Sequence, residues 1–189
     1  MSRVSQNCVY SGRSRSGASA ILLLSAVLLA LPVPANGDDM SAWACKMRIQ
    51  FSGYARPETL TNFPALIAFS NNINNSGFSY GQFASANGWD LRFQNQNETS
   101  LLNHEVERWN TNGGSVVWVQ VTNLFSNGSV WAYWGNTNSS ATSSPAAYTT
   151  NGATWNQGYK GVWHLNQTNR DSTANANNGT SFNNTNANG

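Results

Sequence analysis

Apolar and polar residues alternate with a period of two over much of the chain between residues 45 and 135. This period is typical of β-strands that bury one face, whereas an amphipathic helix repeats about every 3.6 residues. In CKMRIQF, for example, Met47, Ile49 and Phe51 share one face, and basic or polar residues occupy the other. Helical periodicity is nearly absent, so the pattern predicts a series of short strands.

Five further segments have the composition of strands. They are FPALIAF (63–69), WDLRFQN (89–95), LNHEVERW (102–109), SVVWVQV (115–121) and SVWAYWG (129–135). The first is apolar on both faces and is therefore predicted to be a buried strand that begins after Pro64. A Gly-Gly pair and an Asn-Gly pair separate the last three, as hairpin connections do. Together the strands predict an all-β fold, an antiparallel β-sandwich of jelly-roll type, over residues 43–136.

The first 35 residues have a different character. Three arginines precede an apolar run at residues 20–31, and PVPANG follows, where Val33 and Ala35 suit the small-residue rule for signal-peptide cleavage. The run is shorter than the roughly 20 residues that span a bilayer, so a retained membrane anchor is the less favoured alternative. We therefore expect residues 1–35 to be a signal peptide and the protein to be secreted or held at the cell surface.

The remainder of the chain is nearly neutral. Seven basic and eight acidic side chains follow residue 35, a net charge of −1 at pH 7. No basic stripe remains there, so we expect no nucleic-acid partner. Cys45 is the one cysteine after residue 35, which gives no disulfide framework and no cysteine-based zinc site.

Towards the C-terminus the composition becomes polar. Residues 137–157 are rich in Asn, Ser, Thr and Ala and are predicted to form a linker. Residues 158–189 contain one strand-like segment, GVWHL, and then almost only asparagine, small residues and glycine. Such a segment buries little apolar surface by itself. We expect it to be the truncated start of a second domain, whose missing C-terminal part is a partner within the same chain.

Several of these segments carry a resemblance. FSGY, FSYGQFASANGWDLRF, LLNHEVERWN, SVVWVQV and AYWGN resemble a bacterial and archaeal family named only as a domain of unknown function. This family occurs in secreted multidomain proteins and beside biopolymer-transport proteins of the proton-channel type. The resemblance covers about residues 43–136 and implies no activity. Residues 161–180, GVWHLNQ to NNGT, are similar to the opening of a concanavalin-A-like lectin/glucanase domain of the laminin-G type, which often follows.

Glu105 and Glu107 are the strongest candidates for chemistry. Alternate residues of a strand lie on one face about 6.6–7 Å apart, which allows the carboxylate separation of an inverting glycosidase. Laminarinase-type sandwich enzymes carry three acids on such a face, whereas here Trp109 follows the two glutamates. We therefore predict no catalytic residue and expect cross-strand ion pairs with Arg92 or Arg108. A glycoside hydrolase that uses Glu105 and Glu107 is the alternative.

Aromatic residues suggest a binding surface. Trp109, Trp131 and Tyr133 lie in or beside predicted strands, and Asp90 and Arg92 share a face of one strand. This face would join that of the glutamates if the two strands are hairpin partners. Exposed aromatic rings stack on sugars, so these five residues are the candidate ligand-binding set for a polysaccharide or cell-surface glycan. Packing in the core is the favoured competing interpretation.

Metal sites have weak support. Calcium takes oxygen ligands from loops, and one loop region supplies four candidate side chains. These are Asp90, Asn95, Asn97 and Glu98. Turn formation explains the asparagines equally well. His104 and His164 fall in different predicted domains, so the sequence predicts no zinc site and no other cofactor.

These observations favour a secreted, non-catalytic β-sandwich module that acts as an accessory or adhesion unit beside a lectin-like domain, with carbohydrate as the candidate ligand. The alternatives are the glycoside hydrolase and a purely structural spacer. A third carboxylate beside the glutamates would favour the enzyme, and a continuous exposed aromatic strip would favour the binding module. An otherwise apolar surrounding with arginine partners would favour the spacer.

Overall fold

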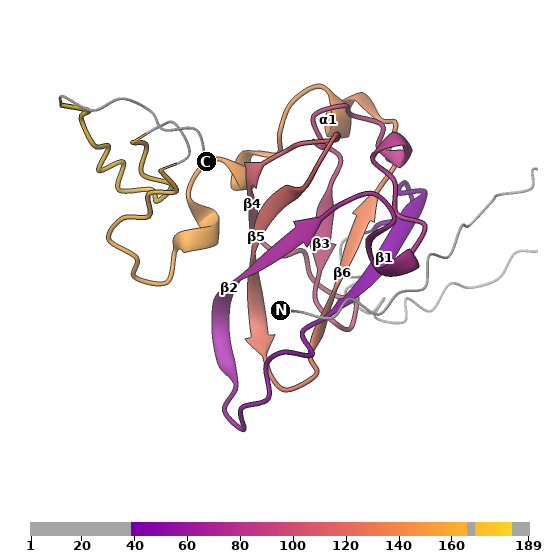
Figure 1. Ribbon diagram of the computed structural model, residues 1–189, viewed down its shortest axis with the longest axis horizontal. Helices are drawn as coiled ribbons and strands as arrows, with labels where there is room; N and C mark the ends of the chain where they lie inside the picture. The colour runs from indigo at the N-terminus through magenta and orange to yellow at the C-terminus, as the bar shows by residue number, and fades with distance from the viewer. Residues whose placement is uncertain (1–38, 166–168, 183–189) are drawn as a thin grey trace, which may run out of the picture.

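The computed structural model describes residues 39–165 and 169–182, and the predicted signal peptide lies outside these ranges. The described chain forms two antiparallel sheets of three strands each, in the orders β1-β6-β3 and β2-β5-β4 (Figure 1). This arrangement confirms the predicted all-β sandwich. None of the helices in the described part of the chain has the length and apolarity needed to cross a bilayer.

The first sheet follows the alternation closely. Strand β6 (Ser129–Trp134) is central and pairs with β1 (Cys45–Gln50) and with β3 (Arg92–Gln94). Val130, Ala132 and Trp134 of β6 point into the core. Trp131 and Tyr133 therefore lie on the outer face of this sheet, because side chains alternate between the faces of a strand.

The second sheet is built on the long strand β5 (Ser115–Leu124). It pairs with β2 (Leu60–Phe69) along nearly its whole length and with the shorter β4 (His104–Arg108). Strand β2 is an edge strand, which explains why Pro64 is tolerated within it. The prediction that this strand is buried on both faces is wrong, since Leu66 on its outer face is 46% exposed. Its outer face is apolar, and no other layer of the described residues covers Leu66 and Ala68.

Aromatic side chains fill the space between the sheets. Phe78 contacts Phe69, Tyr80 and Trp134 at ring-centroid distances of 5.3 Å each. It comes from the segment between β2 and β3, which contains two 3-10 helices, η1 (Ile73–Asn75) and η2 (Tyr80–Gln82). This segment closes one end of the sandwich and gives the core its aromatic character.

Strands β3 and β4 are not hairpin partners. They follow one another in sequence, but β3 pairs with β6 and β4 pairs with β5, so they belong to opposite sheets. A turn held by hydrogen bonds from Thr99 to the side chain of Asn95 reverses the chain, and Leu102 then enters the core. Burial of Leu102 directs the chain across to the second sheet, and it separates Asp90 and Arg92 from the glutamates.

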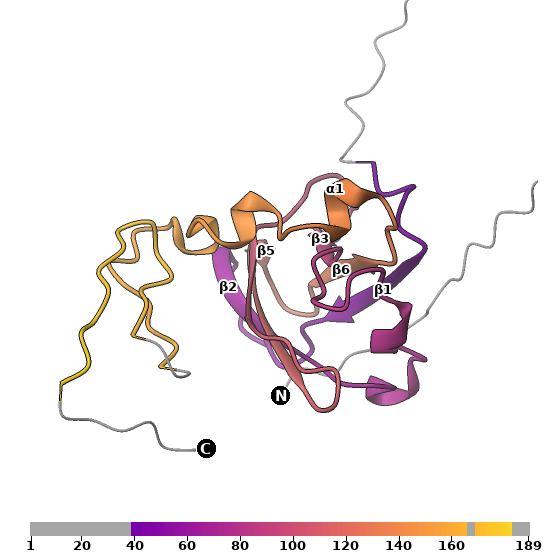
Figure 2. The same cartoon turned by 90° about the horizontal axis from the view of Figure 1, so that it is seen from above.

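The segment predicted as a linker contains three short helices. They are α1 (Ser139–Thr142), η3 (Ala147–Thr149) and η4 (Ala153–Trp155). Ala141, Thr154 and Trp155 are buried. Beyond them, residues 158–165 and 169–182, here called the C-terminal lobe, extend to one side of the sandwich next to the second sheet (Figures 1 and 2). Instead of a predicted strand, the lobe has one isolated bridge between Trp163 and Asp171.

Candidate functional site

Strand β4 forms the edge of the second sheet and presents Glu105 and Glu107 on its outer face. His104 on the opposite face is buried, as the alternation requires. Trp118 of β5 lies directly across the sheet from Glu105, and Leu66 of β2 lies across from Trp118. The outer face of this sheet thus combines an apolar edge with an acidic edge.

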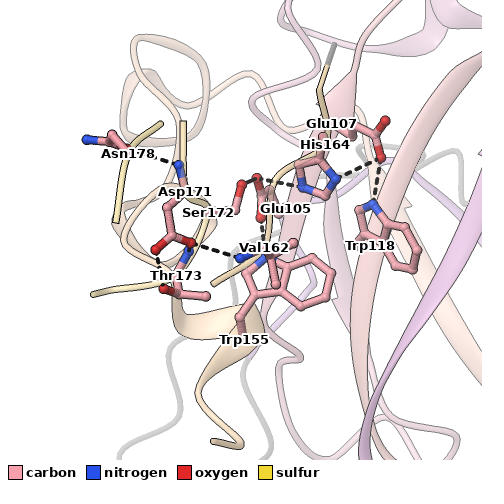
Figure 3. A network of polar contacts seen from close by, with 10 residues as sticks. All are labelled: Glu105, Glu107, Trp118, Trp155, Val162, His164, Asp171, Ser172, Thr173 and Asn178. Carbon is pink, nitrogen blue, oxygen red and sulfur yellow. Dashed lines mark hydrogen bonds and ion pairs between the residues drawn. The ribbon is translucent and has the colours of Figure 1, made fainter. Parts of the chain in front are cut away.

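Both carboxylates are engaged by donors from other elements (Figure 3). The indole Nε1–H of Trp118 donates to Glu107 Oε2 at 2.7 Å, and the indole of Trp155 in η4 donates to Glu105 Oε2. The hydroxyl of Ser172 in the lobe donates to Glu105 Oε1 at 2.5 Å. We call these residues, together with His164, the glutamate network.

His164 lies between the two glutamates. Its Nε2 is 3.4 Å from Glu105 Oε1, and its Nδ1 is 3.3 Å from Glu107 Oε2. The ring stacks on Trp118 at a centroid distance of 6.1 Å and packs at 5.8 Å against Trp155. A neutral imidazole has one donor nitrogen, so it can donate to one carboxylate only, whereas a protonated ring can donate to both.

The prediction that Glu105 or Glu107 pairs with Arg92 or Arg108 is wrong. Arg108 donates from Nε to the Gly114 carbonyl at 3.1 Å. Arg92 lies in the other sheet and donates to the Trp89 and Leu91 carbonyls. Among the described residues, His164 lies within ion-pair distance of both glutamates.

Asp171 organises the lobe that carries Ser172. Its carboxylate accepts hydrogen bonds from the amides of Val162, Thr173 and Asn177 at 2.8–2.9 Å and from the Thr173 hydroxyl. Desolvation alone would raise the pKa of Asp171, but these hydrogen bonds outweigh it and lower the pKa to about 2. A carboxylate held in this way keeps the loop around it in one conformation.

Asp90 is a buried structural group. It is fully buried and accepts hydrogen bonds from the amides of Ala84, Ser85 and Gly135 at 2.7–3.1 Å. Arg92 is also buried, with its guanidinium 5.8 Å from the ring of Trp43. Neither side chain lies on an open face.

Trp131 and Tyr133 lie on the outer face of the first sheet beside Lys46, whose ammonium group is 4.6 Å from the Trp131 ring. The Tyr133 hydroxyl donates to Glu98 Oε2 at 2.5 Å. Desolvation and this hydrogen bond raise the pKa of the Tyr133 hydroxyl. Trp109 is elsewhere, beyond β4, so the structure does not bring the five candidate binding residues together.

The structure does not bring the four candidate calcium ligands together at one site. Asp90, Asn95 and Glu98 instead form hydrogen bonds or ion pairs with other protein groups. Glu98 forms an ion pair with Lys46 at 2.7 Å, and Asn95 bonds Thr99. Desolvation would raise the pKa of Glu98, but hydrogen bonds from Lys46 and Tyr133 lower it. Across the described ranges, no group of three or more His, Cys, Asp or Glu side chains is placed to hold a metal ion.

Two clefts lie along β4. The first, of about 510 Å³, is polar and is lined by Glu105, Glu107, His164 and residues of the lobe. The second, of about 450 Å³, is lined by Trp89, Trp109 and the inner side of β4. Val106, Thr149 and Thr150 line both, so the two clefts adjoin.

Sequence reasoning missed most members of the glutamate network. The candidate residues did not include the four side chains that contact the two carboxylates, which are Trp118, Trp155, His164 and Ser172. One signal was available for Trp118, because alternation places it on the same side of β5 as the polar residues Gln120 and Thr122. Trp155 and Ser172 come from polar segments without a strand or site pattern, and the strand-like segment GVWHL gave no indication that His164 contacts the glutamates.

The network falls within a segment that matches a known family. Residues 87–180 match the family described as "Domain of unknown function (DUF2341)". The DUF2341 match begins before β3 and continues through the helices after β6 into the C-terminal lobe. It therefore includes both glutamates and every residue that contacts them in Figure 3. No curated protein and no solved structure matches the chain.

Proposed function

We propose that this chain is an exported, non-catalytic β-sandwich module that serves as an accessory or adhesion unit beside a lectin-like domain. The observation that carries the proposal is that other side chains of the protein contact both Glu105 and Glu107. Each carboxylate accepts an indole N–H, and both contact the same imidazole ring. These contacts attach the C-terminal lobe to the sandwich edge.

Catalysis by this pair would require different surroundings. A general acid or a nucleophile in a glycosidase must reach its substrate, with the second carboxylate at a defined distance across the scissile bond. Glu105 is covered by Trp155 and Ser172, and the side chains of Glu105 and His164 are only 19% and 11% exposed. The position of a third acid is held by Trp109, whose indole donates to the Ala86 carbonyl.

The neighbouring domain and the export are supported by sequence. Residues 161–180 resemble the opening of a laminin-G-like domain, and residues 1–35 have the pattern of a signal peptide. The contacts of Ser172 and His164 with Glu105 hold this resembling segment against β4. A lectin-like domain that continued from the segment would thus be held close to the sandwich, as an accessory module requires.

One observation favours an enzyme as the second candidate. The polar cleft of about 510 Å³ lies directly beside Glu105 and Glu107, and Arg170 and Asp171 also line it. Its volume is sufficient for a small ligand. If the glutamates released their partners on binding, they could act as an acid and base pair.

Hydrolysis assays distinguish the two candidates. The intact chain and the variants Glu105→Gln and Glu107→Gln are incubated with a panel of β-glucans and related polysaccharides, and the release of reducing ends is measured. The non-catalytic module predicts no release by any of the three proteins. Release by the intact chain that disappears in either variant would establish the hydrolase instead.

A further inference from the structure

The second cleft of about 450 Å³ has no role in the glutamate network. It lies between the turn at residues 87–89, the end of β4 and the segment around η3. We propose that this cleft binds a sugar ring of a neutral polysaccharide, with Trp89 and Trp109 as the stacking side chains. This inference rests on the proposed function and names the ligand class of the module.

Trp109 is held as a rigid platform. Its ring packs edge to face against Tyr80 and Phe83 at 5.2 and 4.9 Å, and its Nε1–H donates to the Ala86 carbonyl at 2.9 Å. A Cβ at Gly88 would lie 2.5 Å from the Trp109 ring, so only glycine lets this turn approach the indole. An aromatic side chain that is fixed before binding loses little conformational entropy when a ligand stacks on it.

The cleft also offers hydrogen-bonding groups. Asn87, Thr149 and Thr150 line it, and both threonine hydroxyls donate to backbone carbonyls, which leaves their oxygens able to accept. Small-molecule sites usually combine apolar and aromatic side chains with a few polar groups, as this cleft does. Ring faces of sugars are apolar while their edges carry hydroxyls, so this lining fits a sugar.

His104 provides a second, independent observation. Its side chain lines the cleft and is 2% exposed, and Nδ1 has no hydrogen-bond partner among the described residues. Buried polar side-chain atoms in proteins usually have a partner. A sugar hydroxyl can both donate and accept a hydrogen bond, so it can satisfy Nδ1 of a neutral imidazole in either tautomer.

The lining indicates a neutral ligand. None of the described residues around this cleft carries a carboxylate, guanidinium or ammonium group. The adjoining polar cleft differs, since Glu105, Glu107, Arg170 and Asp171 line it. Recognition of an anionic polysaccharide relies on arginine or lysine side chains, which this cleft lacks.

The test titrates the intact chain with a neutral glucan oligosaccharide and, separately, with an anionic polysaccharide. Tryptophan fluorescence and calorimetry measure binding. We expect saturable binding of the neutral ligand alone, and we expect Trp89→Ala to weaken it at least about tenfold. Asn87→Ala should weaken binding of the neutral ligand by a smaller factor. Asn87 is exposed and its backbone N–H keeps the bond to Ser85, so this variant tests the cleft even if the tryptophan variant misfolds.

Trp131→Ala is the matched control. It removes one indole from the outer face of the first sheet, away from the cleft, and should leave the affinity unchanged. Loss of binding in this variant with full binding in Trp89→Ala would overturn the inference, as would binding of the anionic ligand alone or of neither ligand. Those outcomes would not contradict the proposal of a non-catalytic module. That proposal fails if the intact chain hydrolyses a polysaccharide and Glu105→Gln abolishes the hydrolysis.

Discussion

Trp118 lies directly across the sheet from Glu105, yet its indole donates to Glu107, two residues further along β4. The diagonal hydrogen bond leaves Glu105 open to donors from outside the sheet. Trp155 and Ser172 supply them, and both belong to the segment that follows β6. Glu107 is therefore bonded within the sheet, whereas Glu105 accepts its hydrogen bonds from that later segment.

The first prediction concerns the stability of this arrangement. Glu105→Gln should lower the free energy of unfolding by about 1–3 kcal/mol, because hydrogen bonds to a charged acceptor become bonds to a neutral amide. Urea denaturation at neutral pH measures it. Glu58→Gln is the control, since the Glu58 side chain is exposed and Tyr54 bonds only its backbone carbonyl. Equal midpoints for the two variants would mean that the contacts of Glu105 do not stabilise the fold.

The second prediction concerns His164. Replacement by alanine removes both carboxylate contacts and the stacking on Trp118. Hydrogen exchange should become faster in residues 169–182 and stay unchanged in β5, because the lobe would lose its attachment while the sheet would keep its own hydrogen bonds. Phe182→Ala, at a position that is 84% exposed, serves as the control. Unchanged protection of the lobe in His164→Ala would show that other contacts hold it.

The third prediction separates a structural role of Asp90 from a binding role. Asp90→Asn places an amide where three backbone N–H groups converge, and one side of that amide can only donate. We expect a loss of about 3 kcal/mol in the free energy of unfolding, since buried donors lose their charged acceptor. A variant with unchanged stability and weakened glycan binding would instead support the ligand-binding role.

The local part of the fold could be predicted from the sequence. Alternation in CKMRIQF places Met47, Ile49 and Phe51 on one face, and all three are buried. The prediction succeeds because the buried face of a strand is read from residues two positions apart in the sequence. Pairing between strands is different, since Phe93 and His104 are close in sequence but lie in strands of opposite sheets.

The site was harder to predict for the same reason. The glutamates were recognised by their spacing, but their partners were not, because nothing local in GVWHL indicates that His164 packs against β4. Asp90 was misleading in another way. A carboxylate in a strand-like segment has the same sequence pattern whether it faces solvent or accepts three backbone amides.

The fourth prediction follows from His104. Desolvation by burial, together with the nearby positive charge of Arg92, lowers its pKa from 6.5 to about 3, although the hydrogen bond with the Leu102 backbone raises it. In the unfolded chain the ring binds a proton below about pH 6.5, while in the folded chain it stays neutral down to about pH 3. The unfolded state therefore binds more protons in this range, and stability falls as the pH falls.

The size of the effect and its origin can be measured together. One proton of difference lowers the free energy of unfolding by at most about 1.4 kcal/mol for each unit that the pH drops. Urea midpoints at about pH 7, 6 and 5 should decrease for the native chain and decrease less for His104→Leu, which cannot titrate. The substitution also changes the packing against Phe93 and Tyr148, so the slopes are compared and not the midpoints themselves. Parallel slopes would assign the acid sensitivity to other groups and would contradict a neutral, buried His104.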